Sequence, residues 1–408
     1  MATLASERGN AGLPLLIVAA GCTIALMTFG PRSAMGLFQV PLLEDRGWDR
    51  STFALAMGIQ NLIWGAGQPF FGAVADRYGA WRVLMLSGLL YATGLVVMAW
   101  GDAPIWLHVG GGILVGLGIA SGSFSIIMAV FARRVPAERR VVVFGMGTAA
   151  GSAGMLVFPP ISSALISTYG WSDALVVLAA LMLLIPVIAI PLAGKPTDQP
   201  GAAAEYEQTV AAALSEALRT KSYLLLTAGF FVCGFQVAFI TVHFPAYISD
   251  NGLDLWVGAY AVALIGGLNI VGSLASGVIG QRYSKPIFLA LLYLGRSVLV
   301  TWYLLTPISA TTTLVFAALM GLLWLSTVAP TNALVATFFG TRYLGMLGGI
   351  VFFSHQVGSF LGVWLGGVLY DLNGSYDPVW WLGVALGVFA AAVHWPIEER
   401  AVTRPLSA

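Results

Sequence analysis

The chain has 408 residues, of which 58% are hydrophobic and 9% charged, and its formal net charge is +1. This composition excludes a water-soluble globular protein, whose surface carries far more charge. It favours an integral membrane protein. The near-neutral net charge does not indicate a partner, and the sequence contains no footprint for nucleic-acid binding.

Apolar stretches long enough to cross a bilayer recur along nearly the whole chain. A hydrocarbon layer roughly 30 Å thick requires about 20 helical residues, and the sequence predicts twelve such spans. They cover residues 13–40, 52–75, 83–101, 104–132, 141–166, 173–193, 223–248, 256–280, 286–306, 311–337, 343–369 and 377–396. The predicted fold class is therefore an all-α membrane protein with twelve transmembrane helices.

Basic residues between the spans favour one side of the membrane. Fifteen Lys or Arg residues fall on one side of the twelve-span arrangement, whereas Arg46 and Arg50 fall on the other. Because cytoplasmic loops carry the excess of Lys and Arg, both termini are predicted to be cytoplasmic. We expect a monomeric, multi-pass protein of the plasma membrane (the inner membrane of the cell), surrounded by lipid.

A polar stretch at residues 194–222 separates a first half, residues 1–193, from a second half, residues 223–408. It contains Pro196 and Pro200 and ends in a predicted amphipathic helix from Glu207 to Arg219. The sequence thus predicts two six-helix bundles joined by a cytoplasmic linker, an architecture typical of transporters with a site between the halves.

A loop motif follows the second span and consists of Gly72, Asp76, Arg77, Gly79 and Arg82. A degenerate copy begins 205 residues later, at position 277, which indicates duplication of one half. The motif resembles the loop signature of the major facilitator superfamily. In such a loop the glycine would permit close helix contact. The charged residues would contact neighbouring helix ends and part as the halves rock.

Other segments resemble monocarboxylate porters and their oxalate:formate exchanger relatives within that superfamily. Pro31, Arg32 and Ser33 are similar to a Pro-Lys-Ser stretch in the first helix of the porters, and residues 131–160 and 366–376 resemble further family segments. The resemblance implies secondary active transport of small organic anions, above all monocarboxylates, by alternating access with proton symport. Anion-for-anion exchange of the oxalate:formate type and export of anionic metabolites or drugs stay open as alternatives.

Arg32 and Arg296 are the two basic residues that fall within the predicted spans, whose interiors contain no Asp or Glu. A charge at this depth costs roughly 2.5–3.5 kcal/mol and usually marks a functional site. Since a guanidinium can hold a planar carboxylate by two hydrogen bonds, Arg32, Arg296 or both are predicted to bind the anion. Alternatively, Arg32 reaches toward the surface from the outer third of its span, and Arg296 braces carbonyls at a helix kink.

Polar residues near the middle of other spans complete the predicted substrate site: Asn61, Ser121, Gln236, Asn269, Thr327, His355 and Gln356. Two differ from the family pattern. Asn269 lies in the eighth span, where monocarboxylate porters carry an Asp and an Arg, and His355 stands nearest the lysine of the exchangers. Because histidine titrates near physiological pH, His355 and His243 are the proton-coupling candidates. His355 can instead form a hydrogen bond that joins helices. His243, toward the outer end of its span, can serve gating or the wetting of an interface instead of ligand contact.

The sequence contains no nucleotide-hydrolysis motif, metal-ligand spacing or catalytic cluster. We therefore expect neither an enzyme nor a cofactor or bound metal, and we expect the energy for transport to come from a gradient. A membrane sensor is disfavoured because no sizeable soluble domain is present.

Overall fold

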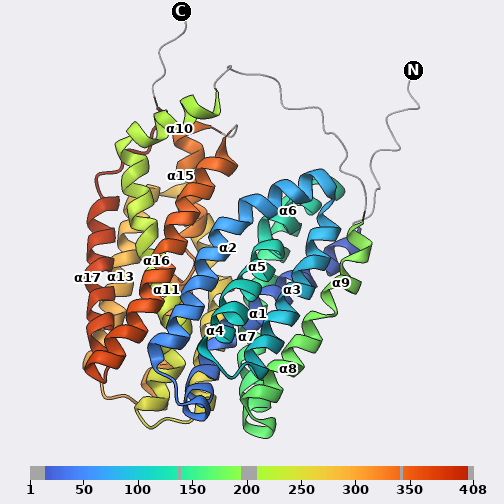
Figure 1. Cartoon of the computed structure of the whole chain (residues 1–408). Coiled ribbons are helices and arrows are strands. Elements are labelled where there is room, and N and C mark those ends of the chain that lie inside the picture. Colours follow the sequence, from blue (N-terminus) through green and yellow to red (C-terminus); the bar gives the residue numbers. More distant parts are fainter. Residues whose placement is uncertain (1–13, 137–138, 194–208, 341–342, 403–408) are drawn as a thin grey trace, which may run out of the picture.

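The computed structural model describes residues 14–136, 139–193, 209–340 and 343–402, and its regular structure is helical (Figure 1). The first half contains α1 (Leu15–Arg46), α2 (Arg50–Tyr78), α3 (Ala80–Trp100), α4 (Pro104–Leu107), η1 (His108–Leu114), α5 (Val115–Ser121), α6 (Phe124–Arg134), α7 (Arg140–Tyr169), α8 (Trp171–Met182), α9 (Ile185–Ile188) and η3 (Ile190–Leu192). The second half contains α10 (Val210–Arg219), α11 (Lys221–Asp250), α12 (Leu255–Arg282), α13 (Lys285–Leu305), α14 (Ala310–Leu323), α15 (Val328–Phe339), α16 (Leu344–Asn373) and α17 (Asp377–His394).

In the described residues, 11 helical segments are long and apolar enough to cross a membrane. The remaining predicted span lies in α2, which has 29 residues but carries Gln60, Asn61 and Gln68 near its centre and is less apolar. The prediction of an all-α membrane fold is confirmed. Helix α2 lies where the second span is predicted, but it is less apolar than the other predicted spans.

The fourth, sixth and tenth predicted spans are not continuous α-helices, and the break in the tenth bears on the site. The tenth, residues 311–337, divides into α14 and α15, with a break at residues 324–327. No Gly or Pro occurs in this break, so the usual sequence signal is missing. A break at membrane depth frees backbone groups that must find partners within the protein, and this requirement shapes the site described below.

Each half has its own hydrophobic core. Side chains from α1 to η3 form one core, joined by a few from α11, α12 and α16, and side chains from α10 to α17 form the other. The linker helix α10 begins after Thr209, whose side chain accepts a hydrogen bond from the amide of Ala212, and it buries Ala213 and Ala217. Residues 194–208 of the predicted linker lie outside the described residues.

The two halves pack closely at the end of the molecule where α2 begins, which we call the closed end. They meet through α1, α2 and α7 on one side and α11, α12 and α16 on the other. A Cβ atom added to Gly36 would lie 2.6 Å from the carbonyl oxygen of Thr241, and one added to Gly367 would lie 2.5 Å from Ala54 Cβ. Such approaches leave room for glycine alone.

The halves are apart at the opposite end of the same helices. A Cβ atom added to Gly72 of α2, Gly145 of α7, Gly277 of α12 or Gly349 of α16 would meet no atom within 4 Å. Hydrogen bonds between described residues of the two halves lie between the helix centres and the closed end. In Figure 1 the two groups of helices diverge toward the top.

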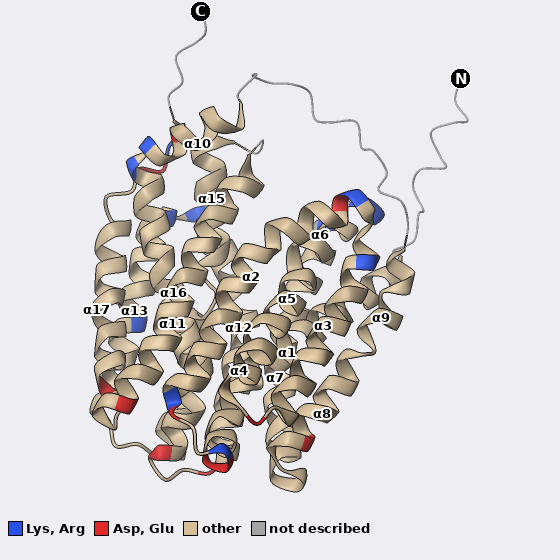
Figure 2. Cartoon of the chain, in the orientation of Figure 1, with Lys and Arg blue, Asp and Glu red and all other residues tan. Residues whose placement is uncertain are grey.

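Charged residues are distributed unequally along the helices. Figure 2 shows Lys and Arg gathered toward the ends at which the halves are apart, and most Asp and Glu toward the closed end, where a smaller basic group also lies. We call the end at which the halves are apart the basic end. Arg8, Lys195, Arg342 and Arg404, which belong to the same predicted side, lie outside the described residues.

Helices α11 and α16 cross so closely that a side chain cannot fit between them. A Cβ atom on Gly358 would overlap the carbonyl oxygen of Phe231. We expect Gly358→Ala to lower the free energy of unfolding by about 2 kcal/mol, the usual range for overpacking, and to lower the midpoint of thermal unfolding in detergent. The matched control is Gly349→Ala on the same helix, where the added Cβ meets open space. Equal midpoints for the two variants would contradict the expected crowding.

Candidate functional site

Arg32 lies near the middle of α1, because this helix continues six residues past the predicted span to Arg46. It is half-buried, and its Nη2 donates a hydrogen bond of 2.9 Å to Asn61 Oδ1 on α2. The guanidinium carbon lies 4.7 Å from the centre of the Trp64 ring, a cation–π contact. Within the described part of the chain, no Asp or Glu forms an ion pair with Arg32.

Several hydrogen-bond donors around Arg32 have no partner. Arg32 Nε, Trp64 Nε1 and the Tyr91 hydroxyl are buried atoms without a hydrogen bond among the described residues. Tyr91 also interacts electrostatically with Arg32. Because an unsatisfied buried polar group costs about 1–3 kcal/mol, this concentration of unused donors requires an explanation. A ligand that only accepts hydrogen bonds, such as a carboxylate, fits them.

Two more predicted residues join Arg32 and Asn61 from α16. Gln356 Nε2 donates to the Asn61 carbonyl oxygen at 3.2 Å, and Gln356 Oε1 lies 3.0 Å from His355 Nδ1. Since an amide oxygen only accepts, Nδ1 of His355 is the donor in this arrangement. We call Arg32, Asn61, His355 and Gln356 the Arg32 cluster. It connects both halves at the middle of α1, α2 and α16.

An aromatic row borders the Arg32 cluster. Phe29 contacts Trp64 with 5.8 Å between ring centres, Trp64 contacts Phe352 at 5.3 Å, and Phe352 stacks on His355 at 5.9 Å. The row runs from α1 through α2 to α16. It provides apolar surface beside the Arg32 guanidinium.

Arg296 has a different environment, in which its hydrogen-bonding capacity is used by the protein. It is 1% exposed, and its Nε and Nη2 donate to the Leu323 carbonyl oxygen at 3.2 and 2.7 Å. Nη2 also donates to the Trp324 carbonyl oxygen, and Nη1 lies 3.5 Å from Gln236 Oε1 and from Cys233 Sγ. This geometry corresponds to the bracing role that the sequence left open for Arg296, because the two carbonyls belong to the break between α14 and α15.

Three other predicted residues lie around the same break. Asn269 Oδ1 accepts a hydrogen bond of 3.0 Å from the Leu325 amide, and its Nδ2 donates to Ser152 Oγ of the first half at 3.0 Å. Thr327 Oγ1 lies 3.2 Å from Cys233 Sγ. Together with Gln236, these residues and Arg296 form a set inside the second half, which adjoins the Arg32 cluster through the interaction between Cys233 and His355.

Ser121 is joined to neither group. Its hydroxyl donates to the Leu117 carbonyl oxygen at 2.7 Å, one turn earlier in α5. This is a local bond of the kind that serine makes within membrane helices. Among the described residues, no hydrogen bond joins Ser121 to another predicted site residue.

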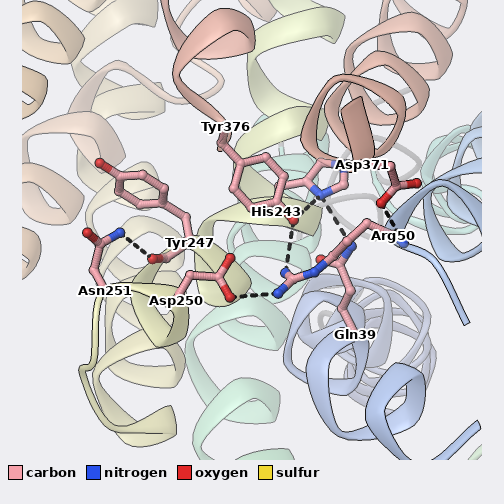
Figure 3. A network of polar contacts seen from close by, with 8 residues as sticks. All are labelled: Gln39, Arg50, His243, Tyr247, Asp250, Asn251, Asp371 and Tyr376. Atoms are coloured by element: carbon pink, nitrogen blue, oxygen red, sulfur yellow. Dashed lines mark hydrogen bonds and ion pairs between the residues drawn. The ribbon is translucent and has the colours of Figure 1, made fainter. Parts of the chain in front are cut away.

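The closed end carries a polar network between the halves that the sequence did not reveal (Figure 3). Arg50 Nη2 forms an ion pair of 2.6 Å with Asp250 Oδ1, and Arg50 Nη1 donates to the Tyr376 hydroxyl at 3.0 Å. The Asp371 carboxylate accepts the backbone amides of Arg50 and Ser51 at 3.0 and 2.9 Å. A carboxylate from one half thus caps the first turn of a helix in the other.

His243, a proton-coupling candidate, belongs to this network and not to the Arg32 cluster. Its Nδ1 lies 3.3 Å from Gln39 Nε2 and 3.2 Å from the Tyr376 hydroxyl, and its Nε2 lies 2.8 Å from the Val363 carbonyl oxygen. Burial raises the pKa of Tyr376, against a smaller lowering by Arg50, so the phenol keeps its proton. We call Gln39, Arg50, His243, Asp250, Asp371 and Tyr376 the gate network.

The loop motif makes its contacts within the first half. Asp76 Oδ1 forms an ion pair of 3.0 Å with Arg133 Nη1 at the end of α6, and Arg82 Nη1 donates to the Tyr78 carbonyl oxygen at 3.3 Å. Arg77 lies over its neighbouring ring, that of Tyr78. Gly79 has φ of 95°, a conformation that favours glycine.

The close helix contact expected at Gly72 is absent in the conformation described. An added Cβ atom at this position would have no neighbour within 4 Å, and the same holds for its repeat counterpart, Gly277. Both glycines lie toward the basic end, where the halves are apart. Their packing role can therefore arise only in another arrangement of the halves.

Comparison with known proteins places this geometry in context. The family model described as Major Facilitator Superfamily matches residues 17–363. Monocarboxylate transporter 13 of Rattus norvegicus is 26% identical over 387 residues, which cover 91% of this chain and 86% of the relative. The uncharacterized MFS-type transporter YcxA of Bacillus subtilis is 25% identical over 359 residues, covering 85% of each chain.

A solved structure has the same overall fold. It is a bacterial homolog of the human lysosomal transporter Spinster in an inward-facing and occupied conformation. The TM-score is 0.75 at 13% identity, and the superposition covers 95% of this chain and 97% of the other.

Proposed function

Since the chain belongs to the major facilitator superfamily, a family of secondary transporters and not of enzymes, we propose that its cargo is a small organic anion, most of all a monocarboxylate. The observation that carries this proposal is the set of unused donors on Arg32, Trp64 and Tyr91, together with the absence of an ion pair to Arg32 among the described residues. A carboxylate supplies the missing acceptors and the missing negative charge.

The surroundings of Arg32 favour a single negative charge with an apolar remainder. Only one guanidinium with unused donors is present there, because Arg296 is engaged with backbone carbonyls. The aromatic row of Phe29, Trp64 and Phe352 offers contact to a hydrocarbon or ring. These features support a monocarboxylate over oxalate, and the similarity to a protein named monocarboxylate transporter 13 agrees with this choice.

We further propose that the basic end is cytoplasmic, following the excess of Lys and Arg in cytoplasmic loops. The separation of the halves at that end then corresponds to an inward-facing state, with the closed end toward the outside. The two halves, with the linker between them, act as the units that rock. This arrangement is the one expected of alternating access in this fold.

Proton symport is the coupling that we propose. The interior of the described spans offers few titratable groups, and His355 is linked through Gln356 to Asn61, the partner of Arg32. Entry of a proton together with a monocarboxylate is electroneutral, which suits a path of low dielectric constant. Exchange of one anion for another and export of anionic compounds are the alternatives that the experiment below distinguishes.

Uptake by proteoliposomes tests the proposal. Vesicles containing the purified protein are given labelled lactate, pyruvate, formate or oxalate, with or without an inward pH gradient, and after preloading with unlabelled anion. We expect lactate or pyruvate to enter faster with the pH gradient. Acceleration by preloading alone would identify an exchanger, and lack of uptake of every anion under both conditions would reject the substrate class.

A further inference from the structure

The gate network assigns a definite hydrogen-bonding state to His243. This residue is 0% exposed. Its Nε2 faces the carbonyl oxygen of Val363, which can only accept, so Nε2 carries the hydrogen. Nδ1 faces the Gln39 amide nitrogen and the Tyr376 hydroxyl, which both can donate. Neutral histidine with its hydrogen on Nε2 satisfies all three contacts, and a histidinium does not.

The hydrogen bonds from Arg50 and Gln39 cross between the halves in one direction, with the donor in the first half and the acceptor in the second. Arg50 Nη1 donates to the Tyr376 oxygen, whose own hydrogen is then available for His243 Nδ1. Gln39 donates to the same nitrogen from α1. Since Arg50 and Gln39 belong to the first half and His243 and Tyr376 to the second, this chain of hydrogen bonds is part of what holds the closed end together.

A proton on Nδ1 would convert the shared acceptor into a donor. It would then face the Gln39 amide and a hydroxyl that already accepts from Arg50. Turning the Gln39 amide would present Oε1, which is buried without a partner. The Tyr376 oxygen would still face two cationic donors, Arg50 and His243. Protonation therefore removes the hydrogen bond from the Tyr376 hydroxyl to Nδ1, and the Gln39 contact between the halves persists only if that amide turns.

Protonation would also place a positive charge on the second half close to Arg50 of the first half, at a side chain with no exposure to solvent. The charged and titratable groups around His243 are Arg50 from α2, Tyr247 and Asp250 from α11, Tyr370 and Asp371 from α16, and Tyr376. Both acids are already engaged: Asp250 pairs with the Arg50 guanidinium, and Asp371 accepts the amides at the start of α2. Neither forms a hydrogen bond with the imidazole among the described contacts.

We propose that His243 is a proton-operated latch, which holds the closed end shut when neutral and releases it when protonated. The latch deepens the proposed proton coupling and rests on the proposed function for its place in the transport cycle. Its sign follows from the contacts: the closed state binds His243 neutral, so lowering the pH favours separation of the halves at this end. The proton must leave His243 before the gate network can form again.

Distance measurement across the closed end tests the latch without any substrate. Spin labels are placed on Glu44→Cys at the end of α1 and Asn373→Cys at the end of α16, both exposed positions in different halves. Cys22 is replaced by Ala, and Cys233 is left because it is fully buried. Pulsed electron–electron double resonance then measures the distribution of distances between the two labels in detergent. The pH is varied from about 8 to about 5, the range in which histidine titrates.

We expect the ratio of open to closed protein to rise about tenfold over this range, the effect of losing one hydrogen bond to a charged group. His243→Gln should abolish the pH dependence, because glutamine keeps a donor toward Val363 but cannot become charged. His108→Gln is the matched control: His108 bonds to Thr52 within the first half, and this variant should keep the wild-type response. Asp371→Asn should increase the open fraction at every pH and shows that the labels detect opening.

Two results would overturn the latch. One is a wild-type distance distribution that does not change with pH while Asp371→Asn opens the closed end. The other is a His243→Gln protein that folds and responds to pH as the wild type does. If His243→Gln does not fold, His243→Asn replaces it, and the wild-type result still decides. Because no anion is present, failure of the latch and failure of the substrate assignment are separate outcomes.

Discussion

Replacing Arg32 by Gln is expected to lower the initial rate of monocarboxylate uptake about 100-fold. The variant removes a guanidinium whose Nε is buried without a partner, and loss of a buried, hydrogen-bonded charge partner costs about 2–5 kcal/mol. Arg32→Lys keeps the charge but loses the planar fork of donors, so we expect a smaller loss of about tenfold. Both rates are measured in proteoliposomes with an inward pH gradient.

Arg219→Gln provides the control for this experiment. Arg219 ends α10 and is exposed to solvent far from the Arg32 cluster, so its replacement changes the net charge by the same amount and should leave uptake unchanged. Uptake by Arg32→Gln at the wild-type rate would remove Arg32 from the anion site, even if monocarboxylates prove to be the cargo.

Arg296→Met is expected to affect the stability of the fold more than the binding of the anion. The variant leaves the carbonyl oxygens of Leu323 and Trp324 without their donor at the break between α14 and α15. Since each unsatisfied buried carbonyl costs about 1–3 kcal/mol, we expect a loss of about 3 kcal/mol in the free energy of unfolding. Thermal unfolding in detergent, followed by tryptophan fluorescence, measures it.

Two further measurements separate a bracing residue from a ligand. Arg219→Met removes an exposed guanidinium and should leave the unfolding midpoint unchanged. In protein of Arg296→Met that remains folded at low temperature, the concentration of anion for half-maximal uptake should stay within about threefold of the wild type, a change below 1 kcal/mol. A normal midpoint combined with a large loss of apparent affinity would assign Arg296 to the anion instead.

The sequence predicts the helical framework because its cause is local. Spans arise from apolar length, and the extent of α7 or α11 follows from composition alone. The break at residues 324–327 could not be predicted in the same way. It is stabilised by Arg296 and Asn269, which lie 28 and 56 residues away from the groups they satisfy. Nothing within the broken segment marks it.

The candidate site was predictable in part for the same reason. Arg32 is conspicuous as a charge in an apolar stretch, whereas the unused state of its donors depends on the positions of Trp64 and Tyr91. The gate network was missed because Arg50 and Asp371 lie at helix ends, where charges are ordinary, and they are 321 residues apart. Only the folded arrangement shows that these charges meet.

The capping of α2 by Asp371 has a consequence for the opposite phase of the transport cycle. When the closed end separates, that carboxylate withdraws and leaves the amides of Arg50 and Ser51 facing water, beside a guanidinium released from Asp250. The exposed start of a helix carries a partial positive charge and attracts anions. The same parting that admits solvent therefore creates an electropositive rim at the entrance, which would draw a negatively charged solute toward the mouth before it reaches Arg32.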